Sequence, residues 1–196
     1  MSFTLEFPII KPSMNKVVAI VGMAGSGKSI ASRVFEGKGF LRIRFGDVTE
    51  QEIRKQGLEV NEENERRTRE ALRDKYGMAA YAVLNQPRID EALKNADVVL
   101  DGLYSWEEYD FFRKRYGVSF RVVAVWSSPA TRYARLRERV NRPLTTEEAS
   151  SRDRAEIERL NKGGPIAIAD FTIINESNLA YLKSETERIM NNIRQG

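Results

Sequence analysis

Short apolar runs recur along the chain, separated by longer stretches in which apolar residues return every three or four positions. The runs are rich in β-branched residues and most are continuously apolar, which is typical of parallel strands covered by helices on both faces. They predict strands at 16–21, 41–45, 97–101, 119–126 and 171–174. A chain of 196 residues can form one sizeable core and is too short for two ordinary domains. The pattern therefore predicts a single α/β domain.

Hydroxyl residues followed three positions later by glutamate mark several predicted helix starts. The pairs are Thr49 with Glu52, Ser105 with Glu108, and Thr145 with Glu148, and Ser128-Pro129 is a further start signal. Residues 47–94 and 128–165 are each longer than one crossover helix requires. We interpret both stretches as helical insertions over one end of the sheet.

Composition excludes several kinds of chemistry. The sequence contains no cysteine and no histidine, so thiol nucleophiles, imidazole bases and zinc sites built on these residues are excluded. Any bound metal must be held by oxygen. Because disulfides, an apolar run of about 18 residues and a signal-like start are all missing, we expect a cytoplasmic protein with no membrane partner. The net charge of +4 is modest and the basic residues are not interleaved with aromatic ones, so no nucleic-acid partner is expected.

Residues 22–29 read GMAGSGKS and fit the phosphate-binding pattern G-x-x-x-x-G-K-[ST], with the apolar strand before it and the helix after it that the pattern requires. Glycines permit backbone conformations closed to other residues, so that successive N–H groups surround an anion. Lys28 would reach the β- and γ-phosphates, and the Ser29 hydroxyl would coordinate Mg²⁺. The loop predicts ATP and Mg²⁺ as cofactors. The predicted ATP-binding residues are Gly22, Met23, Ala24, Gly25, Ser26, Gly27, Lys28 and Ser29.

Two aspartates follow predicted strands at the edge where this loop lies. Asp101 ends the run DVVLD, where a carboxylate can hold Mg²⁺ as a Walker B aspartate does. Asp47 follows Phe45-Gly46 and could orient or deprotonate an acceptor hydroxyl. Each aspartate also fits a local role, Asp101 in capping a loop before Gly102 and Asp47 in capping a helix.

Arginine makes up 22 of the 32 basic residues, and residues 132–159 contain eight arginines and no lysine. If the second insertion folds over the glycine-rich loop, its arginines could neutralise the transferring phosphoryl group and exclude water. The candidates are Arg139, Arg142, Arg152 and Arg154. The first insertion is the natural place for an anionic acceptor, with Arg54, Arg66, Arg67, Arg69 and Arg73. Salt-bridged, solvated helices are the alternative interpretation of both stretches.

Taken together, these residues resemble the small P-loop kinases, and most of all the archaeal-type nucleotide kinases related to dephospho-CoA kinase and adenylate kinase. The motifs concerned are GMAGSGKS, FGD at 45–47, DG at 101–102, SSPATRYARLRER at 127–139, RDRAEIE at 152–158 and IADFTIIN at 168–175. The resemblance covers nearly all of residues 16–193. It implies a three-layer fold with a five-stranded parallel sheet of order 2-3-1-4-5. It also implies a lid near 135–165 and an acceptor-binding insertion near 47–90. From the sequence itself we expect an N-terminal arm at 1–15, with no assigned role, and a single domain at 16–196.

The resemblance also suggests roles for particular residues. The lid arginines of those kinases fall on Arg139, Arg142 and Arg152, and Asp47 matches the aspartate that faces the acceptor hydroxyl in dephospho-CoA kinases. Adenylate kinases carry acceptor-binding arginines at two places where this chain has Glu50 and Ser105. The sequence thus predicts a kinase class more sharply than it predicts the acceptor.

The prediction is an ATP- and Mg²⁺-dependent phosphotransferase acting on a small nucleotide-like acceptor, a nucleoside monophosphate or a dephospho-CoA-type molecule. Its predicted catalytic residues are Lys28, Asp47, Arg139, Arg142 and Arg152, with Arg139 also contacting ATP. The acceptor-binding residues are Asp47, Arg54, Arg69 and Arg73, and the metal ligands are Ser29 and Asp101. The alternative is a P-loop ATPase or a nucleotide-binding regulatory protein that transfers no phosphate. A regulatory GTPase is disfavoured because the guanine-reading pattern [NT]KxD is absent.

Overall fold

Five parallel strands form one sheet in the computed structural model, which describes residues 15–140 and 142–195. The strands are β1 (Val17–Val21), β2 (Leu41–Arg44), β3 (Val98–Asp101), β4 (Phe120–Trp126) and β5 (Phe171–Ile174). Their order in the sheet is β2-β3-β1-β4-β5. The predicted strands and their order are confirmed. Of the predicted arm at 1–15, only Asn15 lies within the described residues.

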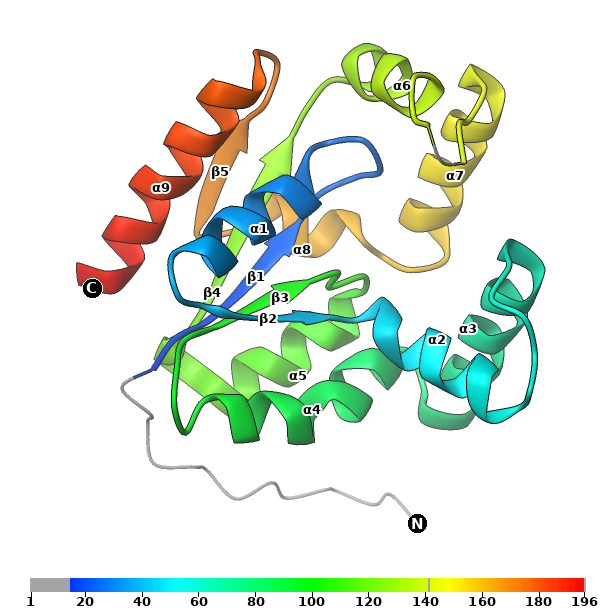
Figure 1. Ribbon diagram of the computed structural model, residues 1–196, viewed down its shortest axis with the longest axis horizontal. Coiled ribbons are helices and arrows are strands. Elements are labelled where there is room, and N and C mark those ends of the chain that lie inside the picture. The colour runs from blue at the N-terminus through cyan, green and yellow to red at the C-terminus, as the bar shows by residue number, and fades with distance from the viewer. Residues whose placement is uncertain (1–14, 141, 196) are drawn as a thin grey trace.

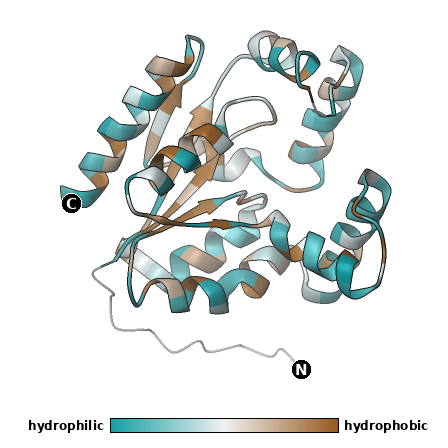
Figure 2. Cartoon of the chain, in the orientation of Figure 1, coloured by the Kyte–Doolittle hydropathy of each residue, from teal (hydrophilic) through white to brown (hydrophobic). Residues whose placement is uncertain are grey.

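Helices cover both faces of the sheet and complete three layers (Figure 1). On one face α1 (Lys28–Gly37) packs beside α9 (Leu179–Gln195), and on the other lie α4 (Ala80–Ala92) and α5 (Trp106–Tyr116). Alternate residues of β1 enter two separate apolar clusters, as a pleated strand buried on both faces requires. Figure 2 shows the result, with apolar strands inside and polar outer helix surfaces.

Two helical insertions lie at the end of the sheet where the parallel strands finish (Figure 1). The first, after β2, contains α2 (Gly46–Lys55) and α3 (Glu62–Tyr76) and leads into α4. The second, after β4, contains α6 (Pro129–Arg137), α7 (Thr146–Glu158) and the short α8 (Gly163–Ala167). A 3₁₀ turn at Gly117–Ser119 joins α5 to β4. Within the described residues, no helix is long and apolar enough to span a membrane.

The local start signals were mostly correct. Ser105 and Thr145 form complete capping boxes with Glu108 and Glu148, and Ser128 caps α6 ahead of its proline. The signal at Thr49 was wrong, because α2 already begins at Gly46. The Thr49 side chain is instead buried, and its hydroxyl lies 2.5 Å from the Tyr81 hydroxyl. Thr49 therefore links α2 to α4 and does not cap a helix.

Candidate nucleotide-binding site

The glycine-rich loop turns tightly between β1 and α1. Gly22, Gly25 and Gly27 have φ angles of 144°, 82° and 107°, a region that side chains other than glycine rarely adopt. A Cβ atom on Gly22 would lie only 2.3 Å from the carbonyl oxygen of Val125 in β4. The predicted backbone conformation of the loop is thus present, and the neighbouring strand leaves no room for a larger residue at Gly22.

Polar side chains at the ends of β4 and β5 hold the loop in place. Asn175 donates a hydrogen bond from Nδ2 to the Ser26 carbonyl at 2.8 Å, and the Ser127 hydroxyl donates to the Asn175 carbonyl at 2.6 Å. Arg132 of α6 donates from Nη1 to the Ala24 carbonyl at 3.1 Å. Sequence reasoning assigned none of these roles. The available signal was position, since Ser127 and Asn175 each directly follow a predicted strand at the edge where the loop lies.

Lys28 lies under the loop and donates from Nζ to the Met23 carbonyl at 2.8 Å. Burial, and after it the nearby positive charge of Lys162, lowers the pKa of this ammonium to about 7, although Glu156 and Asp101 act to raise it. A polyphosphate in the loop would supply the negative charge that favours the ammonium form. The position of Lys28 therefore suits an anionic ligand.

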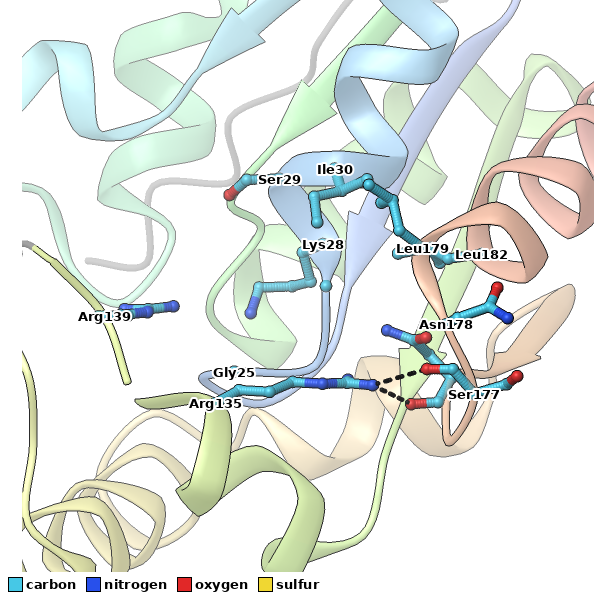
Figure 3. Close-up of a pocket in the computed structure, with 12 residues that line it drawn as sticks. Gly25, Lys28, Ser29, Ile30, Arg135, Arg139, Ser177, Asn178, Leu179 and Leu182 are labelled. Atoms are coloured by element: carbon cyan, nitrogen blue, oxygen red, sulfur yellow. Dashed lines mark hydrogen bonds between the residues drawn. The ribbon is translucent and has the colours of Figure 1, made fainter. Parts of the chain in front are cut away.

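A cavity of about 390 Å³ opens beside the loop. It is lined by Lys28 and Ser29 from the loop and helix α1, by Arg135 and Arg139 from the second insertion, and by Asn178 and Leu179 ahead of and within α9. Figure 3 shows Lys28 and Arg139 pointing toward the same space, and Arg135 bonded to the carbonyls of Asn175 and Ser177 at 3.0 and 3.3 Å. The glycine-rich loop thus forms one side of the cavity, and Arg135, Arg139 and the apolar side chains of Leu179 and Leu182 form other sides. Arg135 is a further residue that sequence reasoning did not single out.

A group of charged side chains lies next to Lys28. Glu156 of α7 accepts hydrogen bonds from Lys162 Nζ at 2.6 Å and from Arg152 Nε at 3.2 Å. Burial acts to raise the pKa of Glu156, but Lys162 and Arg152 hold it below its usual value. The pKa of Arg139 is lowered by burial and by the charge of Arg152. Three of the predicted catalytic residues, Lys28, Arg139 and Arg152, thus lie in one electropositive region.

The predicted metal ligands sit on either side of the loop. Ser29 lies in the first turn of α1 and lines the cavity. Asp101 ends β3, and its Oδ2 accepts hydrogen bonds from Arg42 Nη2 at 2.5 Å and Nε at 3.2 Å. Asp101 is nevertheless close enough to Lys28 to influence its pKa. Within the described residues, no group of three or more acidic side chains could hold a metal by itself. Ser29 and Asp101 carry oxygen ligands of the kind that Mg²⁺ takes, usually one or two from the protein together with water and phosphate oxygens.

Asp47 lies in the first turn of α2 and has two cationic neighbours. Its carboxylate lies 3.3 Å from Arg44 and 3.5 Å from Arg88. The two positions where adenylate kinases have arginine serve other purposes, since Glu50 pairs with Arg44 at 3.5 Å and Ser105 caps α5. Asp47 therefore lies at the expected edge of the sheet, held between two arginines.

The predicted acceptor-binding arginines are spread over the first insertion. Arg54 is exposed in the last turn of α2. Arg69 of α3 pairs with Glu65 at 3.2 Å. Arg142 of the second insertion donates to the same carboxylate from Nη1 at 3.2 Å and from Nη2 at 3.1 Å. Arg73 stacks over the Tyr81 ring at 5.3 Å. The structure thus brings Arg69 and Arg142 together around one anion and leaves Arg54 apart from them.

Comparison with known proteins gives the family. A family described as an AAA domain matches residues 18–159. A UPF0200 protein of Pyrococcus furiosus is 35% identical over 184 residues, which cover 92% of this chain and 98% of that protein. The chain belongs to the UPF0200 family. A UPF0200 protein of Sulfurisphaera tokodaii is also 35% identical, over 183 residues that cover 92% of this chain and 99% of that protein.

Solved structures of small kinases share the fold. Dephospho-CoA kinase from Campylobacter jejuni superposes with a TM-score of 0.56 at 14% identity, covering 93% of this chain and all of that chain. Shikimate kinase from Acinetobacter baumannii, solved with shikimate, gives a TM-score of 0.55 at 18% identity over 93% of this chain and 95% of that chain. The fold is that of the small P-loop kinases, as the sequence resemblance implied.

Proposed function

We propose that this protein transfers the γ-phosphate of ATP, with Mg²⁺, to a hydroxyl or phosphate oxygen of a small nucleotide-like acceptor. The observation that carries the proposal is the cavity in which Lys28 of the glycine-rich loop and Arg139 of the second insertion face a common space. Phosphoryl transfer depends mainly on positioning the reactants and on neutralising the charge of the transferring group. Cations on opposite sides of a phosphate contribute to both.

The loop supplies the binding surface for the donor. Its amides would surround the β-phosphate and Lys28 would lie between the β- and γ-phosphates. The apolar patch at Leu179 and Leu182, next to Arg135, suits the flat face of a base. Mg²⁺, held by Ser29 and directly or through water by Asp101, would neutralise charge on the β- and γ-phosphates.

The first insertion supplies the acceptor side. Asp47 would orient the acceptor hydroxyl and take its proton as the new oxygen–phosphorus bond forms and the bond between the γ-phosphorus and the bridging oxygen of ADP breaks. Arg69, Arg73 and Arg142 would hold an anionic part of the acceptor. Because Glu65 already satisfies Arg69 and Arg142, an acceptor phosphate would have to replace that carboxylate.

A panel assay tests the proposal. Purified protein with MgATP is incubated with nucleoside monophosphates, dephospho-CoA and nucleosides, and ADP release is measured. The expected result is ADP release that depends on one acceptor and vanishes in Lys28→Ala, while the exposed control Lys183→Ala keeps it. ADP release without any acceptor would instead indicate an ATPase. ATP binding without ADP release would indicate a nucleotide-binding regulatory protein.

A further inference from the structure

Lys162 is a buried cation for which the mechanism above has no role. It precedes α8, and its side chain is 2% exposed. Its Nζ lies 2.6 Å from Glu156 and 5.4 Å from the centre of the Tyr104 ring. Lysine is among the residues least often fully buried, because removing an ammonium from water is costly unless an anion compensates it.

The backbone around Lys162 holds it firmly in this place. Asn161 has a φ of 51°, a left-handed conformation that is uncommon outside glycine. A Cβ atom at Gly164 would lie 2.6 Å from the Trp106 ring, so this loop packs directly on α5. The Lys162 ammonium thus lies over the Tyr104 ring, in a loop that packs on Trp106 through Gly164.

Charge is unevenly balanced around Glu156. Lys162 and Arg152 both donate hydrogen bonds to its carboxylate, and Lys28 is close enough that all three cations lower its pKa. Two further carboxylates nearby are already paired, Asp101 with Arg42 and Asp153 with Arg132, each at 2.5 Å. Lys162 also acts to lower the pKa of the buried Glu108, but burial raises that pKa to about 7. One carboxylate thus faces three cations, and burial lowers the pKa of Lys162 as well as that of Lys28. Such a group lacks negative charge until an anion binds.

We propose that Lys162 is a second lysine ligand for the terminal phosphate of a bound nucleoside triphosphate, with Glu156 as its counter-ion in the ligand-free protein. When the triphosphate binds, its terminal phosphate lies beside Lys28. Lys162 and Arg152 then donate hydrogen bonds to this phosphate in place of the Glu156 carboxylate. A nucleoside diphosphate ends one phosphate earlier and leaves the Lys162–Glu156 pair intact. The inference rests on the nucleotide-binding part of the proposed function and does not depend on the acceptor.

Calorimetric titration separates the two nucleotides. A β,γ-imido analogue of ATP and ADP, each with Mg²⁺, are titrated into the full chain and into Lys162→Met, which keeps the length and apolar stem of the side chain. Because a charge-assisted hydrogen bond to phosphate is lost, affinity for the triphosphate analogue should fall about tenfold to a hundredfold. Affinity for ADP should stay within about threefold, since the amides and Lys28 are unchanged. Lys183→Met, on the exposed surface of α9, is the matched control and should change neither affinity.

Two further variants address a purely structural role. Lys162→Arg should restore part of the triphosphate affinity because it restores the positive charge. Glu156→Gln should bind the triphosphate analogue several-fold more tightly than the wild type, because the competing carboxylate is gone. An equal loss of both nucleotides in Lys162→Met, or no loss of either, would overturn the inference and leave Lys162 as a link between α7 and α8. If the wild-type chain bound neither nucleotide, or bound both equally well in Lys28→Ala, the proposed function itself would fail.

Discussion

Helix α7 carries two buried carboxylates one turn apart, and they are paired very differently. Asp153 meets one guanidinium, that of Arg132, in a two-pronged contact at 2.9 and 2.5 Å, and also accepts a hydrogen bond from Tyr133. Glu156 meets Lys162 and Arg152 beside Lys28, so positive charge exceeds negative there. A balanced pair joins two helices of the fold, whereas an unbalanced group is suited to bind an anion. The ratio of charges, more than burial, distinguishes the two roles.

The largest expected effect follows from breaking the balanced pair. Asp153→Asn leaves the buried guanidinium of Arg132 without a counter-charge, which should lower the free energy of unfolding by about 3–5 kcal/mol. Urea denaturation measures the loss, and a saturating triphosphate analogue should not repair it. An unchanged denaturation midpoint would show that the pair does not stabilise the fold.

The unbalanced group should behave differently when its carboxylate is removed. Glu156→Gln should also lower stability in the absence of ligand, because Lys162 is left buried without an anion, by about 1–3 kcal/mol. A saturating triphosphate analogue should restore the lost stability, since its terminal phosphate supplies the missing charge. Thermal unfolding with and without the analogue makes the comparison with Asp153→Asn. Equal losses in both variants, with and without the analogue, would show that Glu156 and Asp153 play the same structural role.

Glu108 provides a third buried carboxylate, fully inaccessible to solvent, which accepts hydrogen bonds from the backbone amides of Tyr104 and Ser105. Burial raises its pKa to about 7, the opposite direction from Glu156. Because the folded-state pKa lies above the unfolded value, the folded state holds the proton more tightly, and stability should fall as pH rises from about 4.5 to 7.

Glu108→Gln keeps a carbonyl oxygen for the amides of Tyr104 and Ser105 while removing the charge. At pH 8 this variant should therefore be about 1–3 kcal/mol more stable than the wild type, and the difference should shrink toward pH 5. Urea denaturation across this range measures both curves. Parallel curves would show that Glu108 titrates as an ordinary exposed glutamate does.

The smallest effect is expected at the contact between the two insertions. Arg142 is 58% exposed where it meets Glu65, so water screens the pair. Arg142→Ala should lower the free energy of unfolding by less than about 1 kcal/mol. Urea denaturation in low and high salt checks it, with Arg188→Ala, from an exposed pair on α9, as the control. A loss comparable with that of Asp153→Asn would mean that the insertions are held together far more strongly than an exposed pair allows.

Local patterns were sufficient wherever one stretch of chain defines a structure. The central strands β1, β3 and β4 are recognisable because a strand buried on both faces needs a nearly continuous apolar run. The glycine-rich loop is recognisable because its backbone needs glycine at fixed spacing. Capping boxes at Ser105 and Thr145 are equally local. Thr49 shows where local patterns fail. It matches the capping pattern with Glu52, yet it lies inside α2 and its hydroxyl contacts that of Tyr81.

Long-range charge pairing lay beyond the same reasoning. Arginine-rich insertions were visible in the sequence, yet Arg132, Arg135 and Lys162 did not stand out, because nothing in their spacing distinguishes them from solvated residues. The roles proposed for Asp47, Arg54, Arg69 and Arg73 in holding an acceptor remain predictions.

The sequence by itself determined the phosphate-binding loop, the order of strands implied by the kinase resemblance, and the concentration of arginine in two insertions. The tertiary structure alone decided which charges meet. Arg42 and Asp101 are 59 positions apart and Arg142 and Glu65 are 77 apart, yet each pair is in contact. The physical reason is distance, since an ion pair forms only when its atoms come within about 4 Å, and separation along the chain does not encode that approach.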